Sequence, residues 1–164
     1  MKEFFFLDDT FTINRDRALR LCKLLIKENL QIKYKISSRI DKVDKELLHY
    51  LAKSGCYRIH YGVESGSQRV LDYLQKEILV EQIYKVIEMT KNENIQIFVY
   101  MMIGVPTETK KEMLQSVELI NKIKPDHVNY SICSPFPKTY LYEQALIEAQ
   151  VKEDYWQSFA ENPD

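Results

Sequence analysis

Residues 95–109, IQIFVYMMIGVPTET, decide the fold class. The apolar run at 95–103 is rich in β-branched and aromatic side chains, which predicts a buried β-strand. Gly104 and Pro106 follow the strand, and Thr107 or Thr109 can cap the helix that we predict over residues 112–123. A strand that runs through a short turn into a helix is the repeating unit of parallel sheets.

The same unit recurs along the chain. We predict five strands, at residues 3–7, 32–37, 58–63, 95–103 and 127–133. Helices are predicted at residues 16–28, 45–53 (capped by Asp44), 67–92 (broken near 76–79), 112–123 and 141–149. The strands begin about 30 residues apart, which is the length of one βα unit. Helices between consecutive strands imply parallel pairing with right-handed crossovers.

This succession predicts an α/β fold with about five parallel strands and flanking helices. Two architectures satisfy it, an open doubly wound sheet and a sector of a (β/α) barrel of the TIM-barrel type. We assign residues 1–150 to this domain. Residues 151–164 are polar, carry the Tyr155–Trp156 pair and are predicted to be a tail.

Composition narrows the class of protein. The 164 residues suffice for one buried core, and 23 basic against 24 acidic side chains give a net charge of −1. A nucleic-acid partner is therefore not expected. No apolar run approaches the roughly 18 residues of a membrane span, and the N-terminus is not a secretory signal. Cys22, Cys56 and Cys133 fit neither a disulfide framework nor a closed metal site, so we expect reduced thiols in the cytoplasm.

Polar or glycine-containing segments follow every predicted strand. Ligands bind at the carboxyl ends of parallel strands in both architectures, so these segments predict a small-molecule site. After the first strand, the adjacent carboxylates of Asp8 and Asp9 need a cation, an ammonium group or a helix N-terminus to offset their repulsion. Alternatively, Asp9 or Thr12 caps the next helix.

The second and third strand ends carry a basic and an acidic candidate. Arg39 could bind a carboxylate, although a surface arginine is equally consistent. Glu64 lies in GVESGS (62–67) and could accept hydrogen bonds from a diol such as a ribose, with Ser65 or Ser67 as a helix cap in the alternative reading.

Several other sites are excluded by their missing motifs. The sequence contains neither Gly-x-Gly-x-x-Gly nor a Gly-Lys-Ser/Thr phosphate loop. His49, His60 and His127 lack zinc spacing, and no Ser-His-Asp set can be assigned. His60 lies within a predicted strand, where a core histidine is the expected reading.

Five segments of the chain together resemble successive blocks of the radical S-adenosylmethionine (SAM) core. They are FFLDDTFT (5–12), SRID (38–41), AKSGCYRIHYGVESGS (52–67), MMIGVPTET (101–109) and SPFPKTYLYE (134–143). The branch most similar is the cobalamin-associated one related to anaerobic magnesium-protoporphyrin IX monomethyl ester cyclase.

The resemblance implies a partial (β/α) barrel, of which this chain corresponds to strands two to six. In that family a 4Fe-4S cluster, held by Cys-x3-Cys-x2-Cys, binds SAM and cleaves it reductively to a 5′-deoxyadenosyl radical. This sequence has no such motif. We therefore expect the first strand and cluster loop to be missing, with the cluster and any cobalamin belonging to a parent protein.

The resemblance also suggests roles for residues at the strand ends and for Lys76, twelve residues beyond Glu64. All of them are expected to contact SAM: Asp8 and Asp9 near its amino group, Arg39 beside it, Glu64 at the ribose with Ser65 and Gly66 extending that loop, Lys76 toward the carboxylate, and Ile103, Gly104 and Pro106 along adenine. Lys76 could equally be a solvated lysine at a helix end. Thr107 and Lys138 stand where the family often has glycine, so their side chains should narrow the two loops.

Two expectations about the isolated chain follow. Without cluster ligands it should bind SAM weakly or not at all, and it should not cleave SAM. The alternatives are a degenerate SAM- or nucleotide-binding scaffold and an unrelated α/β domain. The substrate cannot be read from the residues. The strand at 3–7 should form an exposed edge, which predicts self-association through Phe4, Phe5 and Phe6.

Overall fold

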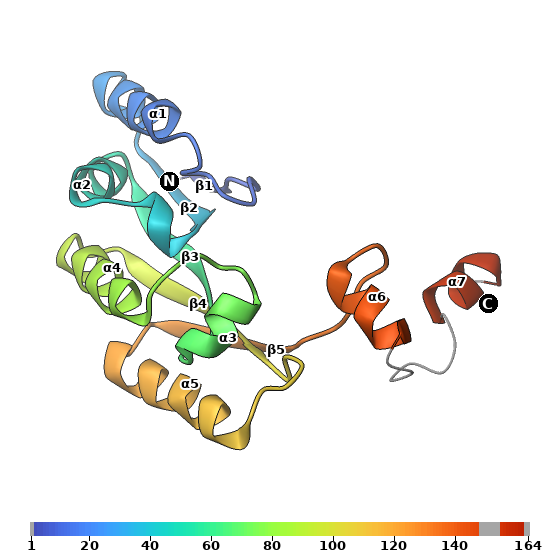
Figure 1. Cartoon of the computed structure of the whole chain (residues 1–164). Helices are drawn as coiled ribbons and strands as arrows, with labels where there is room; N and C mark the ends of the chain where they lie inside the picture. The colour runs from blue at the N-terminus through green and yellow to red at the C-terminus, as the bar shows by residue number, and fades with distance from the viewer. Residues whose placement is uncertain (1, 148–154, 163–164) are drawn as a thin grey trace. The chain divides into compact units, whose positions relative to one another are not determined.

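The computed structural model describes residues 2–147 and 155–162 (Figure 1). The strands are β1 (Lys2–Phe5), β2 (Ile32–Ser38), β3 (Cys56–Glu64), β4 (Gln96–Ile103) and β5 (His127–Ile132). The helices are α1 (Arg15–Lys27), α2 (Lys45–Lys53), α3 (Gln68–Tyr73), α4 (Val80–Asn92), α5 (Lys110–Ile123), α6 (Tyr140–Ile147) and α7 (Tyr155–Glu161), with a 3-10 turn η1 (Ile40–Lys42).

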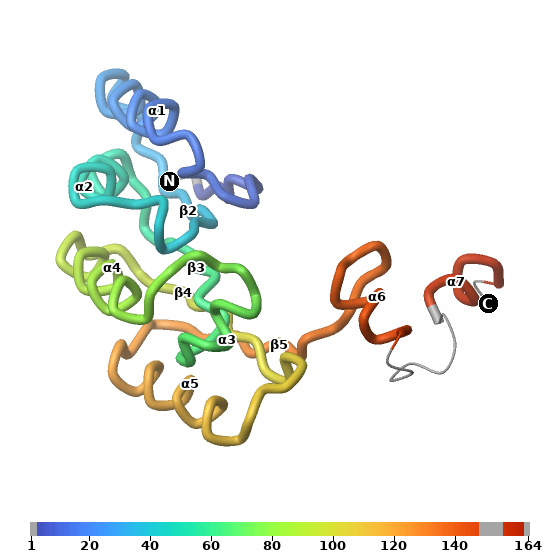
Figure 2. The backbone as a smooth tube through the Cα atoms, in the orientation of Figure 1, coloured from blue at the N-terminus to red at the C-terminus, as the bar shows by residue number. Residues whose placement is uncertain are grey.

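The sheet has the order β1-β2-β3-β4-β5, and every neighbouring pair is parallel. Helices α1, α2, α4 and α5 form a row beside these strands (Figure 2). A doubly wound sheet would reverse its strand order and place helices on both faces. The sequential order instead gives a curled half-barrel, so the predicted partial (β/α) barrel is confirmed.

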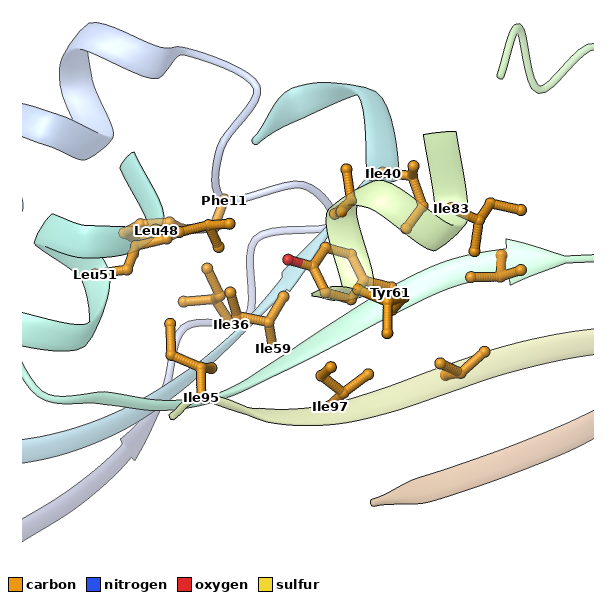
Figure 3. Close-up of a cluster of buried hydrophobic side chains, with 14 of the residues drawn as sticks. Phe11, Ile36, Ile40, Leu48, Leu51, Ile59, Tyr61, Ile83, Ile95 and Ile97 are labelled. Carbon is orange, nitrogen blue, oxygen red and sulfur yellow. The ribbon is translucent and has the colours of Figure 1, made fainter. Parts of the chain in front are cut away.

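The core lies between the strands and this row of helices. Alternate strand residues, such as Ile36, Ile59 and Ile97, are buried there against Leu48 and Ile83 (Figure 3). Two buried tyrosines reach polar partners within the core. The Tyr61 hydroxyl lies 2.9 Å from Thr90 Oγ1, and the Tyr34 hydroxyl lies 2.6 Å from Ser54 Oγ. Their polar ends are thus satisfied without water.

Helices α2, α3 and α5 are capped by residues that the sequence analysis named as candidates. Asp44 caps α2, as predicted. Of the two candidates Thr107 and Thr109, Thr109 caps α5, in a capping box with Glu112. Ser67 caps α3, which is the alternative reading of its loop. Asn14 caps α1, so the alternative reading, in which Asp9 or Thr12 caps this helix, was wrong. Residues 74–79 separate α3 from α4, which confirms the predicted break.

The chain divides into two compact units, Met1–Ile132 and Cys133–Asp164. The second unit contains α6 and also α7, where the sequence indicated only a tail. Within it, Trp156 Nε1 donates to the Pro135 carbonyl oxygen at 3.2 Å. Residues 148–149 of the predicted last helix and residues 151–154 and 163–164 of the predicted tail lie outside the described residues.

Among the described residues, each helix is too short or too polar to span a bilayer. 

Candidate functional site

A cavity of about 500 Å³ lies at the carboxyl ends of β1, β2 and β3, on the face of the sheet opposite the helices. Its lining includes five of the predicted site residues, Asp8, Asp9, Arg39, Glu64 and Lys76. The remaining lining residues are Phe5, Leu7, Thr10, Ser37, Ser38, His60, Gly62 and Tyr100. The structure thus brings together side chains from positions 5 to 100 of the sequence.

Glu64 and Lys76 form an ion pair in this cavity. Lys76 Nζ lies 2.9 Å from Glu64 Oε1, and the two side chains are only 19% and 18% exposed. Gly62 makes room for the pair, because a Cβ at that position would lie 2.7 Å from Glu64 Oε1 and 3.4 Å from Lys76 Nζ. The carboxylate and the ammonium therefore lie over the backbone of β3.

The backbone around this pair is held in an unusual conformation. Glu64 has φ 70°, and Gln75 and Glu77, on either side of Lys76, have φ 52° and 56°. Residues with a Cβ avoid this left-handed region unless their surroundings compensate. Arg39 compensates at the Lys76 turn, since its Nη2 donates to the Lys76 carbonyl oxygen at 2.7 Å. Its Nε donates to Asp41 at 2.8 Å.

Asp8 and Asp9 differ in their partners. Asp8 Oδ1 accepts a hydrogen bond from Arg17 Nη2 at 2.7 Å, so an arginine offsets part of the predicted repulsion. Asp9 makes no side-chain hydrogen bond or ion pair within residues 2–147 and 155–162. Its carboxylate is therefore free to meet a positively charged ligand in the cavity.

Ser65 and Gly66 have contacts away from the cavity. Ser65 Oγ lies 3.3 Å from Ser116 Oγ, and the Gly66 amide donates to Ser116 Oγ at 2.9 Å. A Cβ on Gly66 would clash with the Gln115 carbonyl group and lie 2.8 Å from Ser116 Cα. This loop needs glycine because α5 packs directly on it. Contact of Ser65 and Gly66 with SAM stays a prediction.

Ile103, Gly104 and Pro106 lie at the carboxyl end of β4 but outside the cavity lining. Gly104 has φ 75°, and its amide donates to Glu108 Oε2 at 2.8 Å. Thr107 and Lys138 have φ 65° and 62°, a conformation that glycine adopts more easily. At Thr107 the strain is offset by Arg69, which donates to its carbonyl oxygen and hydroxyl at 3.0 and 3.1 Å.

The cysteines do not assemble a metal site. Cys22 and Cys56 are buried on the helical face, and burial raises the pKa of the Cys56 thiol far above its usual range. Cys133 belongs to the second unit. No group of three or more potential ligands occurs in the part of the chain that the structure describes. The three cysteines therefore do not provide the ligand set of an iron–sulfur cluster.

His60 and Tyr100 were missed as site residues. The expectation of a satisfied core histidine was wrong: His60 is buried, at 6% exposure, but it lines the cavity, and its Nε2 has no hydrogen-bond partner among the described residues. Its neighbours Ile59 and Tyr61 face the helices, so the two-residue period of a strand directs His60 to the opposite face. That alternation was the sequence signal that could have identified it.

Comparison with known proteins assigns a family. The sequence model of the radical SAM superfamily matches residues 1–120. An uncharacterized methyltransferase of Pyrococcus horikoshii is 29% identical over 159 residues, covering 97% of this chain and 35% of that protein. Anaerobic magnesium-protoporphyrin IX monomethyl ester cyclase of Cereibacter sphaeroides is 29% identical over 152 residues, covering 90% of this chain and 25% of that protein.

A solved structure supports the same fold. The radical SAM methyltransferase TsrM of Kitasatospora setae, with cobalamin and an iron–sulfur cluster bound, superposes with a TM-score of 0.81 at 15% identity. The match covers 89% of this chain and 28% of TsrM. This chain thus spans about a third or less of these proteins.

Alanine substitution at two glycines tests whether the packing of α5 requires glycine at position 66. Gly66→Ala should lower the free energy of unfolding by about 1–3 kcal/mol, because the new methyl group meets the backbone of α5. Gly62→Ala is the matched control, since its methyl group meets only the ends of two flexible side chains. Urea denaturation measures both. Equal destabilisation by the two variants would contradict this assignment.

Proposed function

The chain belongs to the radical SAM superfamily, and from this premise we propose that it is the portion of a radical SAM core that positions SAM. SAM is held at the carboxyl ends of the strands for reductive cleavage to a 5′-deoxyadenosyl radical. The cluster that supplies the electron belongs to the parent protein, as does cobalamin where it is used. Its relatives include proteins named as a cyclase and as methyltransferases, so the reaction that follows cleavage stays open.

The Glu64–Lys76 pair over Gly62 is the observation that supports this proposal. SAM carries an ammonium, a carboxylate and a ribose diol, and the cavity offers a partner for each of them. Asp9 has a carboxylate available for the ammonium, Lys76 suits the carboxylate, and Glu64 suits the diol. Arg39 holds the Lys76 turn in place and is a positioning residue as well as part of the lining.

The pair also prepares the site for its ligand. Two charges that are each about four-fifths buried are costly unless they have partners. Before SAM binds, they satisfy each other at 2.9 Å. When SAM binds, its carboxylate and hydroxyl groups replace this mutual contact, so neither charge is left unpaired.

Substitution at the pair should weaken SAM binding. Lys76→Met removes the partner of the SAM carboxylate, and we expect an affinity loss of about tenfold or more. Glu64→Gln retains a hydrogen-bonding side chain and should lose less. Lys85→Met, on the exposed face of α4, is the matched control and should bind like the wild-type chain. Titration followed by NMR reads the weak affinities expected here, and equal binding by all variants would contradict the site.

The isolated chain should not cleave SAM. After anaerobic iron–sulfur reconstitution and reduction, we expect no 5′-deoxyadenosine, because the described cysteines do not assemble a cluster. One cluster per chain together with 5′-deoxyadenosine would overturn this expectation. The second candidate function is a degenerate nucleotide- or SAM-binding or scaffold module without catalysis, and the absence of SAM cleavage by the complete parent protein would favour it.

We further propose self-association through β1. This strand pairs with β2 along one edge, and Phe4 and Phe5 are 47% and 38% exposed. Phe6 should contribute less to this self-association than Phe4 and Phe5, because its ring already packs inside the chain. Its ring centroid lies 5.0 Å from that of Phe11 and 5.3 Å from that of Tyr34. Light scattering should give the mass of a dimer or larger species for the wild-type chain and of a monomer for Phe4→Lys. A wild-type monomer at high concentration would disprove the proposal.

A further inference from the structure

A row of aromatic rings crosses the sheet on the face opposite the helices. Phe5, His60, Phe98 and His127 come from four different strands, and we call them the ring row. The His60 and Phe98 rings are stacked, with centroids 4.5 Å apart and planes 7° from parallel. Phe5 lies 5.3 Å from His60 on one side, and His127 lies 5.9 Å from Phe98 on the other.

His60 has an incomplete set of hydrogen bonds. Its Nδ1 lies 3.2 Å from the Tyr100 hydroxyl, while Nε2 is buried and lacks a partner in the described part of the chain. Burial, assisted by the charges of Lys35, Arg58 and His127, lowers the pKa of His60 to about 4. The ring is therefore neutral at pH 7, and Nε2 is a buried polar atom without a hydrogen-bond partner among the described residues.

Two cations beside the ring row lack acidic partners. Lys35 Nζ lies 4.8 Å from the centroid of the Phe5 ring. Arg58 donates from Nε and Nη2 to the neutral Gln96 Oε1, at 3.0 and 2.8 Å. Neither residue forms an ion pair with a carboxylate within the described residues. This part of the face is thus complementary to an anion.

The ring row adjoins the proposed SAM site. Phe5, His60 and Tyr100 line the same cavity as Glu64 and Lys76. A molecule lying on the ring row would therefore be next to SAM.

We propose that the substrate is a flat conjugated ring carrying a carboxylate or phosphate group, and that it binds on the ring row. Its ring lies across the edges of the Phe5 and Phe98 rings, whose faces are covered by their neighbours in the row and by Lys35. Its polar edge meets the Tyr100 hydroxyl beside His60, and its acidic group faces Lys35 and Arg58. An aliphatic ligand would not use the aromatic quadrupoles, and a cationic ligand would be repelled. The inference rests on the proposed function, because this ligand is a substrate only if SAM binds beside it.

Three probes, added to the whole chain, test whether the ligand needs an aromatic ring and whether it needs an acidic group. Indole-3-acetate has the ring and the acid, tryptamine replaces the acid by an ammonium, and cyclohexylacetate replaces the ring by a saturated one. In NMR titrations, indole-3-acetate should bind about tenfold more tightly than either of the others. Its shifts should centre on Phe5, His60 and Phe98. Equal affinities, no binding, or shifts centred elsewhere would each overturn the inference.

Variants separate the two requirements. Lys35→Met should reduce the preference for indole-3-acetate over tryptamine, because Arg58 alone then faces the acid. His60→Phe should weaken the binding of indole-3-acetate about threefold, because it keeps a ring but removes both nitrogens. His60→Gln retains hydrogen-bonding groups and serves if the phenylalanine variant does not fold. The control Lys85→Met should change the affinity for neither indole-3-acetate nor tryptamine. Unchanged probe binding in every variant would overturn the inference.

SAM titrations keep this inference distinct from the proposed function. Lys35 lies outside the cavity lining, so Lys35→Met should bind SAM like the wild-type chain, unlike Lys76→Met. If SAM displaces indole-3-acetate and shifts the ring row, the face belongs to adenine and the inference is wrong. If the probe binds as expected but Lys76→Met binds SAM as the wild-type chain does, the ligand chemistry is supported and the proposed function is overturned.

Discussion

The ion pair between Glu64 and Lys76 is the interaction on which the site depends. Parallel strands bring their carboxyl ends to one edge, but the sheet alone does not hold charged groups away from water. Glu64 and Lys76 satisfy each other in a largely buried position, and Gly62 leaves the space they fill. The strained backbone at Glu64, Gln75 and Glu77 persists because Arg39 and the ion pair hold it.

Much of the fold could be predicted from local patterns. The periodicity of apolar residues predicts the regular spacing of strands and helices. Asp44 and Thr109 cap helices through short-range hydrogen bonds, which local sequence can predict. The choice between an open sheet and a barrel sector could not be made in this way. Both have the same periodicity and differ only in strand order, which is a long-range property. Asn14 likewise competed with two other good capping residues, and the backbone geometry decided among them.

The site was predictable where its residues lie at strand ends and less so elsewhere. Asp8, Asp9, Arg39 and Glu64 lie at or just after the ends of strands and line one cavity. Lys76 lines it too, but it lies between α3 and α4 and was suggested only by the family resemblance. Gly66 illustrates the difficulty, because a glycine that admits a ligand and a glycine that admits a helix look the same in sequence. Here its immediate neighbour is α5. His60 was misjudged because burial alone does not tell on which face of the sheet a residue lies.

The most direct test of this account is a crystal structure of the chain with SAM bound. We predict that the SAM carboxylate lies within hydrogen-bonding distance of Lys76 Nζ, that the ribose hydroxyls contact Glu64, and that the direct contact between these two side chains opens. SAM bound elsewhere on the chain, with the Glu64–Lys76 pair intact at 2.9 Å, would contradict the account.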